Sequence, residues 1–145
     1  MLAMELDTAA VKPFMASLLR EDLFDKFETR SVEVVGKSRI SIENNAEGGY
    51  IPWGELRPLV HTIVKAGGKP RYVKVVLSFP GEKTSVVHGN AAALFLNLVY
   101  ENDGVTFTTA TAQREFQLEK TLDQAWDTWV AGFFARKGLE VKSRE

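Results

Sequence analysis

Two β-strand patterns joined by a short polar connector constrain this chain most. Residues 92–101 are mostly apolar, residues 105–112 are rich in β-branched Thr, and Asn102-Asp103-Gly104 between them tolerate the positive φ of a tight turn. A hairpin of this kind places two neighbouring strands antiparallel in one sheet. Residues 28–35 and 38–43 alternate apolar and polar side chains around Gly36-Lys37, which predicts a second hairpin with Gly36 at the first turn position.

Further stretches add strands and loops. Residues 71–79 are apolar on both faces, which is typical of a central strand, and residues 1–6 predict a short opening strand. Residues 44–49 have a loop composition, and residues 82–90 are compatible with a loop or a short helix. The charged tail, residues 140–145, is expected to fray.

Three segments carry apolar residues at helical spacing, so that each predicted helix has one apolar face. The second helix ends at Gly67-Gly68, and the third opens with the capping-box pattern Thr121-x-x-Gln124. Trp129 lies in the aromatic stripe of the third helix and is expected to be buried. The predicted helices run from about residue 9 to 20, from 53 to 66, and from 121 to 137.

The order of these segments predicts the fold class. It reads strand, helix, strand, strand, helix, strand, strand, strand, helix, so strands and helices do not alternate one for one. We therefore expect an α+β fold, with three main helices on a largely antiparallel sheet of about five to six strands. A length of 145 residues suits one domain over residues 1–145.

Composition limits the chemistry available to the chain. It has 18 Lys and Arg, 19 Asp and Glu, 2 His and no Cys, with a formal net charge of −1. The lack of cysteine excludes disulfides, thiolate nucleophiles and cysteine-ligated metal centres. Near-zero net charge gives no global attraction to nucleic acid or anionic lipid. Without an export signal or an apolar run near the ~20 residues of a membrane span, we expect a cytoplasmic protein with no membrane partner.

Familiar catalytic fingerprints are missing from the sequence. It has no glycine-rich phosphate loop and no nucleophile elbow, and His61 and His88 are too few for a zinc site unless carboxylates converge on them. We therefore predict no catalytic residue, metal or cofactor, and lean away from an enzyme. The residues that we single out for binding are Trp53, Glu55, Arg57 and His61.

Charge is uneven along the chain despite the balanced total. Residues 65–83 contain five cations and one anion, Glu82, which gives a local charge of 5 − 1 = +4 in nineteen residues. Such a strip can attract an anionic partner such as nucleic acid. It can equally be a solvated helix end and strand edge, where Lys also blocks edge pairing. The cations of the strip are Lys65, Lys69, Arg71, Lys74 and Lys83.

The stretch Trp53-Gly54-Glu55-Leu56-Arg57-Pro58 carries a resemblance to a known family. Together with the opening Met-Leu-Ala, Phe14-Met15 and Leu23-Phe24-Asp25, this W-x-E-L-R-P stretch resembles a family of small bacterial proteins known only as a domain of unknown function. The resemblance covers most of the chain and implies no activity. A role in the fold is sufficient for the stretch, with Trp53 at the helix entry, Glu55 at the positive helix end and Arg57 paired with a carboxylate.

Three hypotheses for the function follow. The first is a non-catalytic interaction or assembly module that binds a protein partner or forms a homo-oligomer, because catalytic signatures are missing and large aromatics are abundant. The second is a nucleic-acid-associated protein that uses the strip from Lys65 to Lys83. The third is a small-molecule binder or enzyme with a dispersed site around His61, Glu55 and Arg57.

Overall fold

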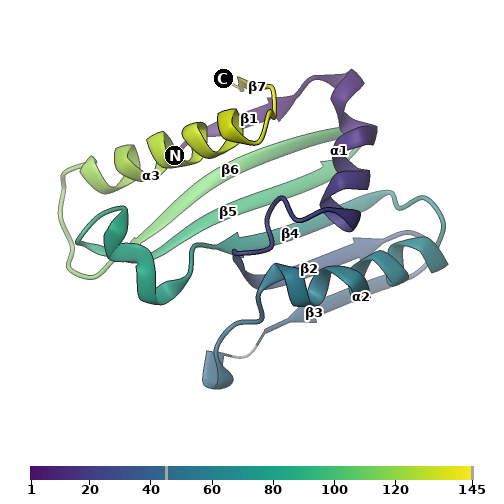
Figure 1. The fold of residues 1–145 in the computed structure, drawn as a ribbon, viewed down its shortest axis with the longest axis horizontal. Coiled ribbons are helices and arrows are strands. Elements are labelled where there is room, and N and C mark those ends of the chain that lie inside the picture. Colours follow the sequence, from purple (N-terminus) through teal and green to yellow (C-terminus); the bar gives the residue numbers. More distant parts are fainter. Residues whose placement is uncertain (45, 145) are drawn as a thin grey trace.

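The computed structural model describes residues 1–44 and 46–144. Within these residues it contains one seven-stranded sheet with every neighbouring pair antiparallel and the order β3-β2-β4-β5-β6-β1-β7 (Figure 1). The strands are β1 (Ala3–Leu6), β2 (Glu28–Val35), β3 (Arg39–Glu43), β4 (Tyr72–Ser78), β5 (Ala91–Glu101), β6 (Gly104–Gln113) and β7 (Val141–Ser143).

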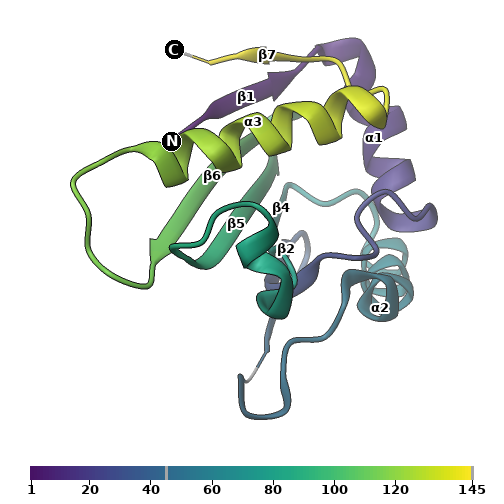
Figure 2. The same ribbon diagram turned by 60° about the vertical axis from the view of Figure 1, so that its left-hand side comes forward.

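Three α-helices lie on the same side of this sheet (Figures 1 and 2). They are α1 (Thr8–Arg20), α2 (Trp53–Ala66) and α3 (Thr121–Arg136), and two short 3-10 helices, η1 (Ala46–Gly48) and η2 (Gly81–Val86), lie in connections. The predicted α+β class with three main helices on an antiparallel sheet is confirmed. α2 has the bounds expected from its apolar spacing, since Gly68 at φ 74° ends it.

The strand register explains why one face of the sheet is covered. Val32, Val75, Leu98, Phe107 and Met4 are aligned across five neighbouring strands, and all five side chains are buried. Successive residues of a strand point to opposite faces, so the alternate positions form the face without helices. Side chains there are partly exposed.

Aromatic side chains connect the helices to the covered face. Phe107 of β6 meets Phe14 of α1 at 5.5 Å and Phe134 of α3 at 4.8 Å between ring centroids. Trp126 is fully buried, and its Nε1–H donates to the Phe95 carbonyl at 2.8 Å. Trp129 is only partly buried, where it stacks on Trp126 at 5.3 Å. The predicted full burial of Trp129 is therefore wrong, because the residues of α3 that are buried are Leu122, Trp126, Val130, Phe133 and Phe134, and Trp129 lies at the edge of that stripe.

The charged tail does not fray as predicted. Residues Val141–Ser143 form β7, which pairs with β1 through Met4↔Ser143 and Leu6↔Val141, and the Arg144 N–H donates to the Ala3 carbonyl at 2.9 Å. β1 has an edge with unpaired backbone groups beyond β6, and the tail satisfies them. This adds a strand that local composition did not indicate. Residue 145 of the predicted tail lies outside the described residues.

The predicted capping box at Thr121 is also wrong. α3 has Lys120 at its N-cap with no side-chain cap, and the Gln124 N–H bonds to the Lys120 carbonyl at 3.0 Å. The Thr121 hydroxyl lies 3.2 Å from Nε2 of His88 instead. The hydroxyl therefore has a partner from a distant segment, which a local pattern does not reveal.

One of the two predicted hairpin turns has the expected conformation and the other does not. Asn102 and Asp103 have φ of 52° and 57° and form the whole connector between the paired Glu101 and Gly104, which confirms that hairpin. The other hairpin joins Val35 to Arg39 through three residues, and Gly36 does not adopt positive φ. The predicted loop 44–49 contains η1, and its residue 45 lies outside the described residues.

Candidate functional site

The W-x-E-L-R-P stretch fastens the start of α2 to the preceding chain. The Trp53 ring is fully buried and its Nε1–H donates to the Leu18 carbonyl in α1 at 3.3 Å. The Trp53 backbone N–H donates to the Phe27 carbonyl at 2.8 Å. Glu55 is exposed in the first turn of α2. Trp53 therefore joins α2 to α1 and offers no surface to a partner.

Arg57 and Asp25 form a two-pronged ion pair. Arg57 Nε and Nη2 donate to Asp25 Oδ1 and Oδ2, each at 2.9 Å, and the side chains are 18% and 26% exposed. The hydrogen bond to Asp25 raises the pKa of Arg57 above its ordinary value. A Cβ on Gly54 would lie 3.0 Å from the Asp25 Cβ and Cγ, so the glycine leaves room for this carboxylate. Arg57 thus has a role in the fold.

A cleft of about 650 Å³ separates α1 from α2 and is mainly apolar. Val11, Met15 and Leu19 of α1 line one side, and Val64 of α2 lines the other. Tyr100 of β5 also lines it. Apolar side chains of α1 therefore face α2 across an open space, and Met15 is the partly exposed one among them.

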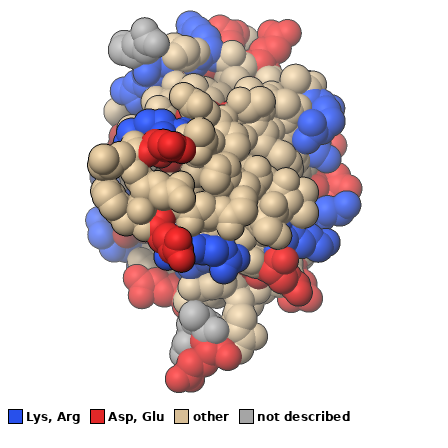
Figure 3. All heavy atoms as spheres, turned by 90° about the vertical axis from the view of Figure 1, so that its left-hand side faces the viewer, with Lys and Arg blue, Asp and Glu red and all other residues tan. Residues whose placement is uncertain are grey.

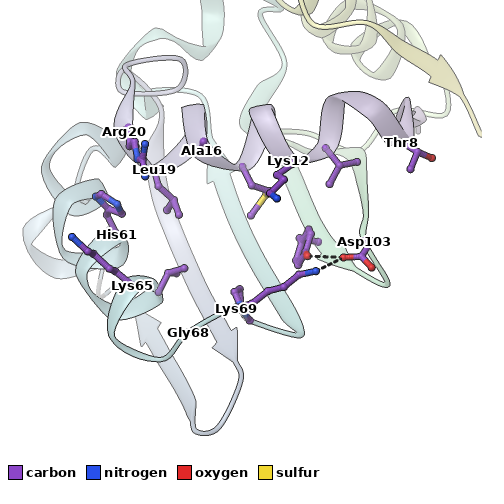
Figure 4. A pocket seen from close by; sticks show the side chains of 15 residues that line it. Thr8, Lys12, Ala16, Leu19, Arg20, His61, Lys65, Gly68, Lys69 and Asp103 are labelled. Carbon is purple, nitrogen blue, oxygen red and sulfur yellow. Dashed lines mark hydrogen bonds and ion pairs between the residues drawn. The ribbon is translucent and has the colours of Figure 1, made fainter.

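Basic side chains border this cleft on both helices. α1 contributes Lys12 and Arg20, and α2 contributes His61 and Lys65 (Figure 4). His61 and Lys65 are four residues apart, and Lys12 and Arg20 are two such intervals apart with Ala16 between them, so each pair lies along one side of its helix. Within the described part of the chain, no ion pair or hydrogen bond engages these four side chains.

One ion pair neutralises a further cation at the cleft. Lys69 Nζ lies 2.8 Å from Asp103 Oδ1, and the Tyr100 hydroxyl donates to the same oxygen at 3.2 Å. The hydrogen bond from Lys69, with a second from Tyr100, lowers the pKa of Asp103 below its ordinary value. Burial, with the hydrogen bond to Asp103 next, raises the pKa of Tyr100. Asp103 is therefore a carboxylate with its partners already in place.

The structure distributes the predicted site residues over several places. His61, Lys65 and Lys69 line the cleft, whereas Trp53, Glu55 and Arg57 do not. Lys74 lies on the face of β4 away from the helices, opposite Glu33 of β2, and Lys83 lies in η2. The strip that is continuous in sequence is therefore divided in space, and Arg71, which precedes β4, lies outside the cleft as well.

The contribution of α1 to this cleft was not predicted from the sequence. Lys12, Ala16 and Arg20 follow each other at four-residue intervals beside the apolar stripe and all line the cleft. His61 and Lys65 have the same interval on α2. Two helices with basic side chains at this spacing were the available signal, but only the tertiary structure shows that the two faces meet.

The described residues contain neither a candidate metal cluster nor a membrane-spanning helix. Across residues 1–44 and 46–144, no group of three or more His, Asp or Glu side chains is placed to hold a metal ion. None of the helices described there is long and apolar enough to cross a bilayer.

Comparison with protein families assigns the chain to a family but indicates no activity. Residues 17–142 match the family of unknown function DUF5721. The chain belongs to this family. The resemblance seen at the W-x-E-L-R-P stretch is thereby confirmed. The matched region begins inside α1, so it includes Arg20, His61 and Lys65 of the cleft, whereas Lys12 and Met15 precede it. No curated protein and no solved structure shows a significant match to the chain.

Proposed function

We propose that this chain is a cytoplasmic binding module whose α1–α2 cleft takes up an amphipathic anion, a small molecule with an apolar body and a negatively charged end. The observation that carries the proposal is an apolar cleft bordered by cations without carboxylate partners. No catalytic step is assigned to the cleft.

The size and lining of the cleft suit a small molecule. Its volume of about 650 Å³ falls in the range of roughly 300–1,000 Å³ that is common for ligand pockets. Met15 and Val64 are partly exposed on its walls, so a ligand that covers them removes apolar surface from water. Such burial contributes about 25 cal/mol per Å².

The charges around the cleft indicate that the ligand carries a negative charge. Its lining contains four Lys and Arg side chains against one carboxylate, Asp103, which Lys69 and Tyr100 already engage. Lys12, Arg20 and Lys65 therefore produce a positive potential over an apolar surface. An anion with an apolar body matches both properties, whereas a neutral apolar molecule matches one.

Binding of decanoate by isothermal titration calorimetry tests this proposal, with decanol as the uncharged comparison. We expect decanoate to bind more tightly than decanol, Met15→Glu to abolish binding of both, and Lys65→Glu to weaken decanoate at least tenfold. Lys142→Glu makes the same charge change on the distant β7 and should leave the affinity unchanged. Equal affinities of the Lys65→Glu and Lys142→Glu variants for decanoate, or binding of decanol as tight as that of decanoate, would refute the proposal.

A second candidate function is self-association through the end of the molecule that carries residues 113–118. Phe116 and Leu118 are 82% and 84% exposed, although hydrogen bonds hold the loop at two places. The Gln113 amide bonds twice to the Gln117 backbone, at 3.2 and 3.0 Å. The Asn90 amide bonds twice to the Glu115 backbone, at 2.9 and 3.0 Å. A loop fixed in this way loses little further entropy when its apolar side chains are covered.

The neighbourhood of this loop favours a second copy of the chain as the partner. The loop itself carries Arg114 and Glu115, which have opposite charges, whereas residues 84–100 and 104–113 contain no Lys, Arg, Asp or Glu. Figure 3 shows this end as mostly uncharged, with charged side chains mainly toward its margin. A two-fold contact brings each patch against its own copy, so like charges would repel if they lay at its centre. The third large exposed side chain here is Val86, at 78%.

Sedimentation over a range of protein concentrations tests self-association. We expect a weak, concentration-dependent dimer that Phe116→Ser with Leu118→Ser abolishes. Leu59→Ser, which changes an exposed leucine on α2, is the control. A chain that stays monomeric at millimolar concentration would exclude this function. The nucleic-acid hypothesis retains its own test in salt-sensitive binding at low ionic strength. Its five cations do not share one face, because Lys65 and Lys69 line the cleft and Lys74 lies on the opposite side of the sheet.

A further inference from the structure

We propose that the charged end of the cleft ligand is a phosphate monoester, bound between Arg20 of α1 and the His61–Lys65 pair of α2. This inference rests on the proposed function of the cleft and names the chemical class of its ligand. Figure 4 shows the Arg20, His61 and Lys65 side chains gathered at one end of the cleft, with the Lys69–Asp103 pair toward the other.

The basic side chains along one side of α2 differ in whether a carboxylate engages them. Arg57, His61 and Lys65 follow each other at four-residue intervals, so they lie along one side of the helix. Asp25 engages Arg57 through two hydrogen bonds of 2.9 Å. No carboxylate within the described residues engages the next two members of the row, which are the two that line the cleft. The cleft end is therefore the part of this row that lacks an anion.

The donors at this end fit a phosphate better than a carboxylate. A guanidinium presents a planar fork, an ammonium is a compact charge and an imidazole adds a ring N–H, so Arg20, Lys65 and His61 can each address a different oxygen. A carboxylate has two oxygens and one charge. A phosphate monoester has three terminal oxygens and a charge of about −1.5 to −2 at pH 7.

The apolar walls set the direction of the rest of the ligand. Leu19 adjoins Arg20, and Met15 and Val11 continue along the same side of α1 toward its N-terminal end. An alkyl chain attached to the phosphate can therefore lie along Leu19, Met15 and Val11. Tyr100 lines the cleft beside the Lys69–Asp103 pair, in which Asp103 already neutralises Lys69.

Four ligands with the same ten-carbon chain test the headgroup: decyl phosphate, decyl sulfate, decanoate and decanol, titrated by calorimetry below their micelle concentrations at pH 7.5. We expect decyl phosphate to bind at least tenfold more tightly than decanoate, with decyl sulfate between them. Arg20→Met and Lys65→Met should each weaken decyl phosphate about tenfold and leave decanol unchanged. Lys142→Met is the matched control, and all three side chains are exposed, so the fold should tolerate the changes.

The possible failures separate the two proposals. If none of the four ligands binds, the proposed function of the cleft is wrong. If decanoate and decyl phosphate bind equally, the cleft keeps its function and the phosphate inference is wrong. If Arg20→Met and Lys65→Met bind decyl phosphate as the unmodified chain does, the headgroup does not lie between α1 and α2.

The same headgroup can come from a soluble ester or from a lipid. Co-sedimentation with phosphatidylcholine vesicles, with and without phosphatidic acid, distinguishes these sources. Binding only to vesicles that contain phosphatidic acid, lost in Lys65→Met, supports a lipid phosphate. Decyl phosphate binding without vesicle binding supports a soluble ester. Equal binding to vesicles with and without phosphatidic acid would overturn recognition of the phosphate.

Discussion

At the scale of single residues, the W-x-E-L-R-P stretch acts on the fold through partners outside it. Trp53 reaches the Leu18 carbonyl, and Arg57 reaches Asp25 in the segment between α1 and β2. Asp25 also explains the glycine in the stretch, since it packs where a Cβ at Gly54 would lie. Three positions of the stretch thus depend on residues 18–25.

Arg57→Met tests the ion pair with Asp25. Because the pair is half-buried and doubly hydrogen-bonded, we expect its loss to reduce the free energy of unfolding by about 1–2 kcal/mol. Arg39→Met removes an exposed arginine that meets Glu33 through one contact of 3.3 Å and should cost about 0–0.5 kcal/mol. Urea unfolding of both variants measures the difference. Similar losses in the two variants would contradict a special role for Arg57.

Two helical glycines should respond oppositely to alanine. Gly54→Ala crowds the Asp25 Cβ and Cγ at 3.0 Å, so we expect it to destabilise the chain. Gly132→Ala in α3 meets only the end of the flexible Arg136 side chain at 3.3 Å, so it should stabilise the chain by about 0.5–1 kcal/mol. Thermal unfolding of both variants measures the sign. A stabilising Gly54→Ala would show that Asp25 moves freely.

The sequence predicted some of the residues with a role but not the residues that they meet. An ion-pair partner for Arg57 was expected, but Asp25 lies 32 positions away, and no local pattern selects it among the acids. His61 and Lys65 were singled out separately, one as a binding residue and one as part of the basic strip. Their meeting with Arg20 depends on how α1 and α2 pack, which the sequence pattern does not specify.

At the scale of elements, segments with strong local signals were predicted and segments that depend on distant partners were not. The spacing of apolar residues determined α2, and the positive φ of Asn102 and Asp103 determined the β5–β6 hairpin. β7 has three residues and a charged composition, so its strand conformation depends on pairing with β1. Thr121 shows the same dependence, because His88 engages its hydroxyl.

Truncation after Leu139 tests the pairing of β7 with β1. We expect the backbone amides of β1 to exchange with solvent faster, because a flanking strand is lost, while the amides of central β4 keep their protection. Hydrogen exchange followed by mass spectrometry measures both strands. Lys142→Ser in the full chain preserves the backbone and serves as the control. Unchanged protection of β1 after truncation would show that β7 contributes no stability there.

At the scale of the whole molecule, one contact ties the end of the helical layer to the sheet. Lys69 follows α2 and Asp103 lies in the β5–β6 turn, so their ion pair joins two parts of the fold beside the cleft. The fold class could be predicted from the sequence because it follows from hairpins and helix spacing. The strand order and the cleft could not, because both depend on pairings between distant segments.

The Lys69–Asp103 pair predicts an acid-side change in stability. The pKa of Asp103 is lowered by Lys69 and then Tyr100, so folding favours its ionised form. Its contribution is complete above the ordinary pKa of 3.8 and is lost as the pH falls through the lower folded value. We expect Asp103→Asn, which replaces the carboxylate by an amide of the same shape and tolerates the positive φ of this position, to reduce the pH dependence of unfolding below pH 3.8. Urea unfolding at several pH values measures it, and an unchanged slope would contradict the prediction.

The place of β1 between β6 and β7 has a consequence for synthesis of the chain. The four ladders that join β3, β2, β4, β5 and β6 involve no strand outside this group, so they can form in turn as the ribosome extends the chain. β1 is made first, yet one of its partners ends at residue 113 and the other at residue 143. Met4 and Leu6 therefore lack their final neighbours until residues 113 and 143 have been synthesised, and during that interval these apolar side chains are open to aggregation or to chaperones.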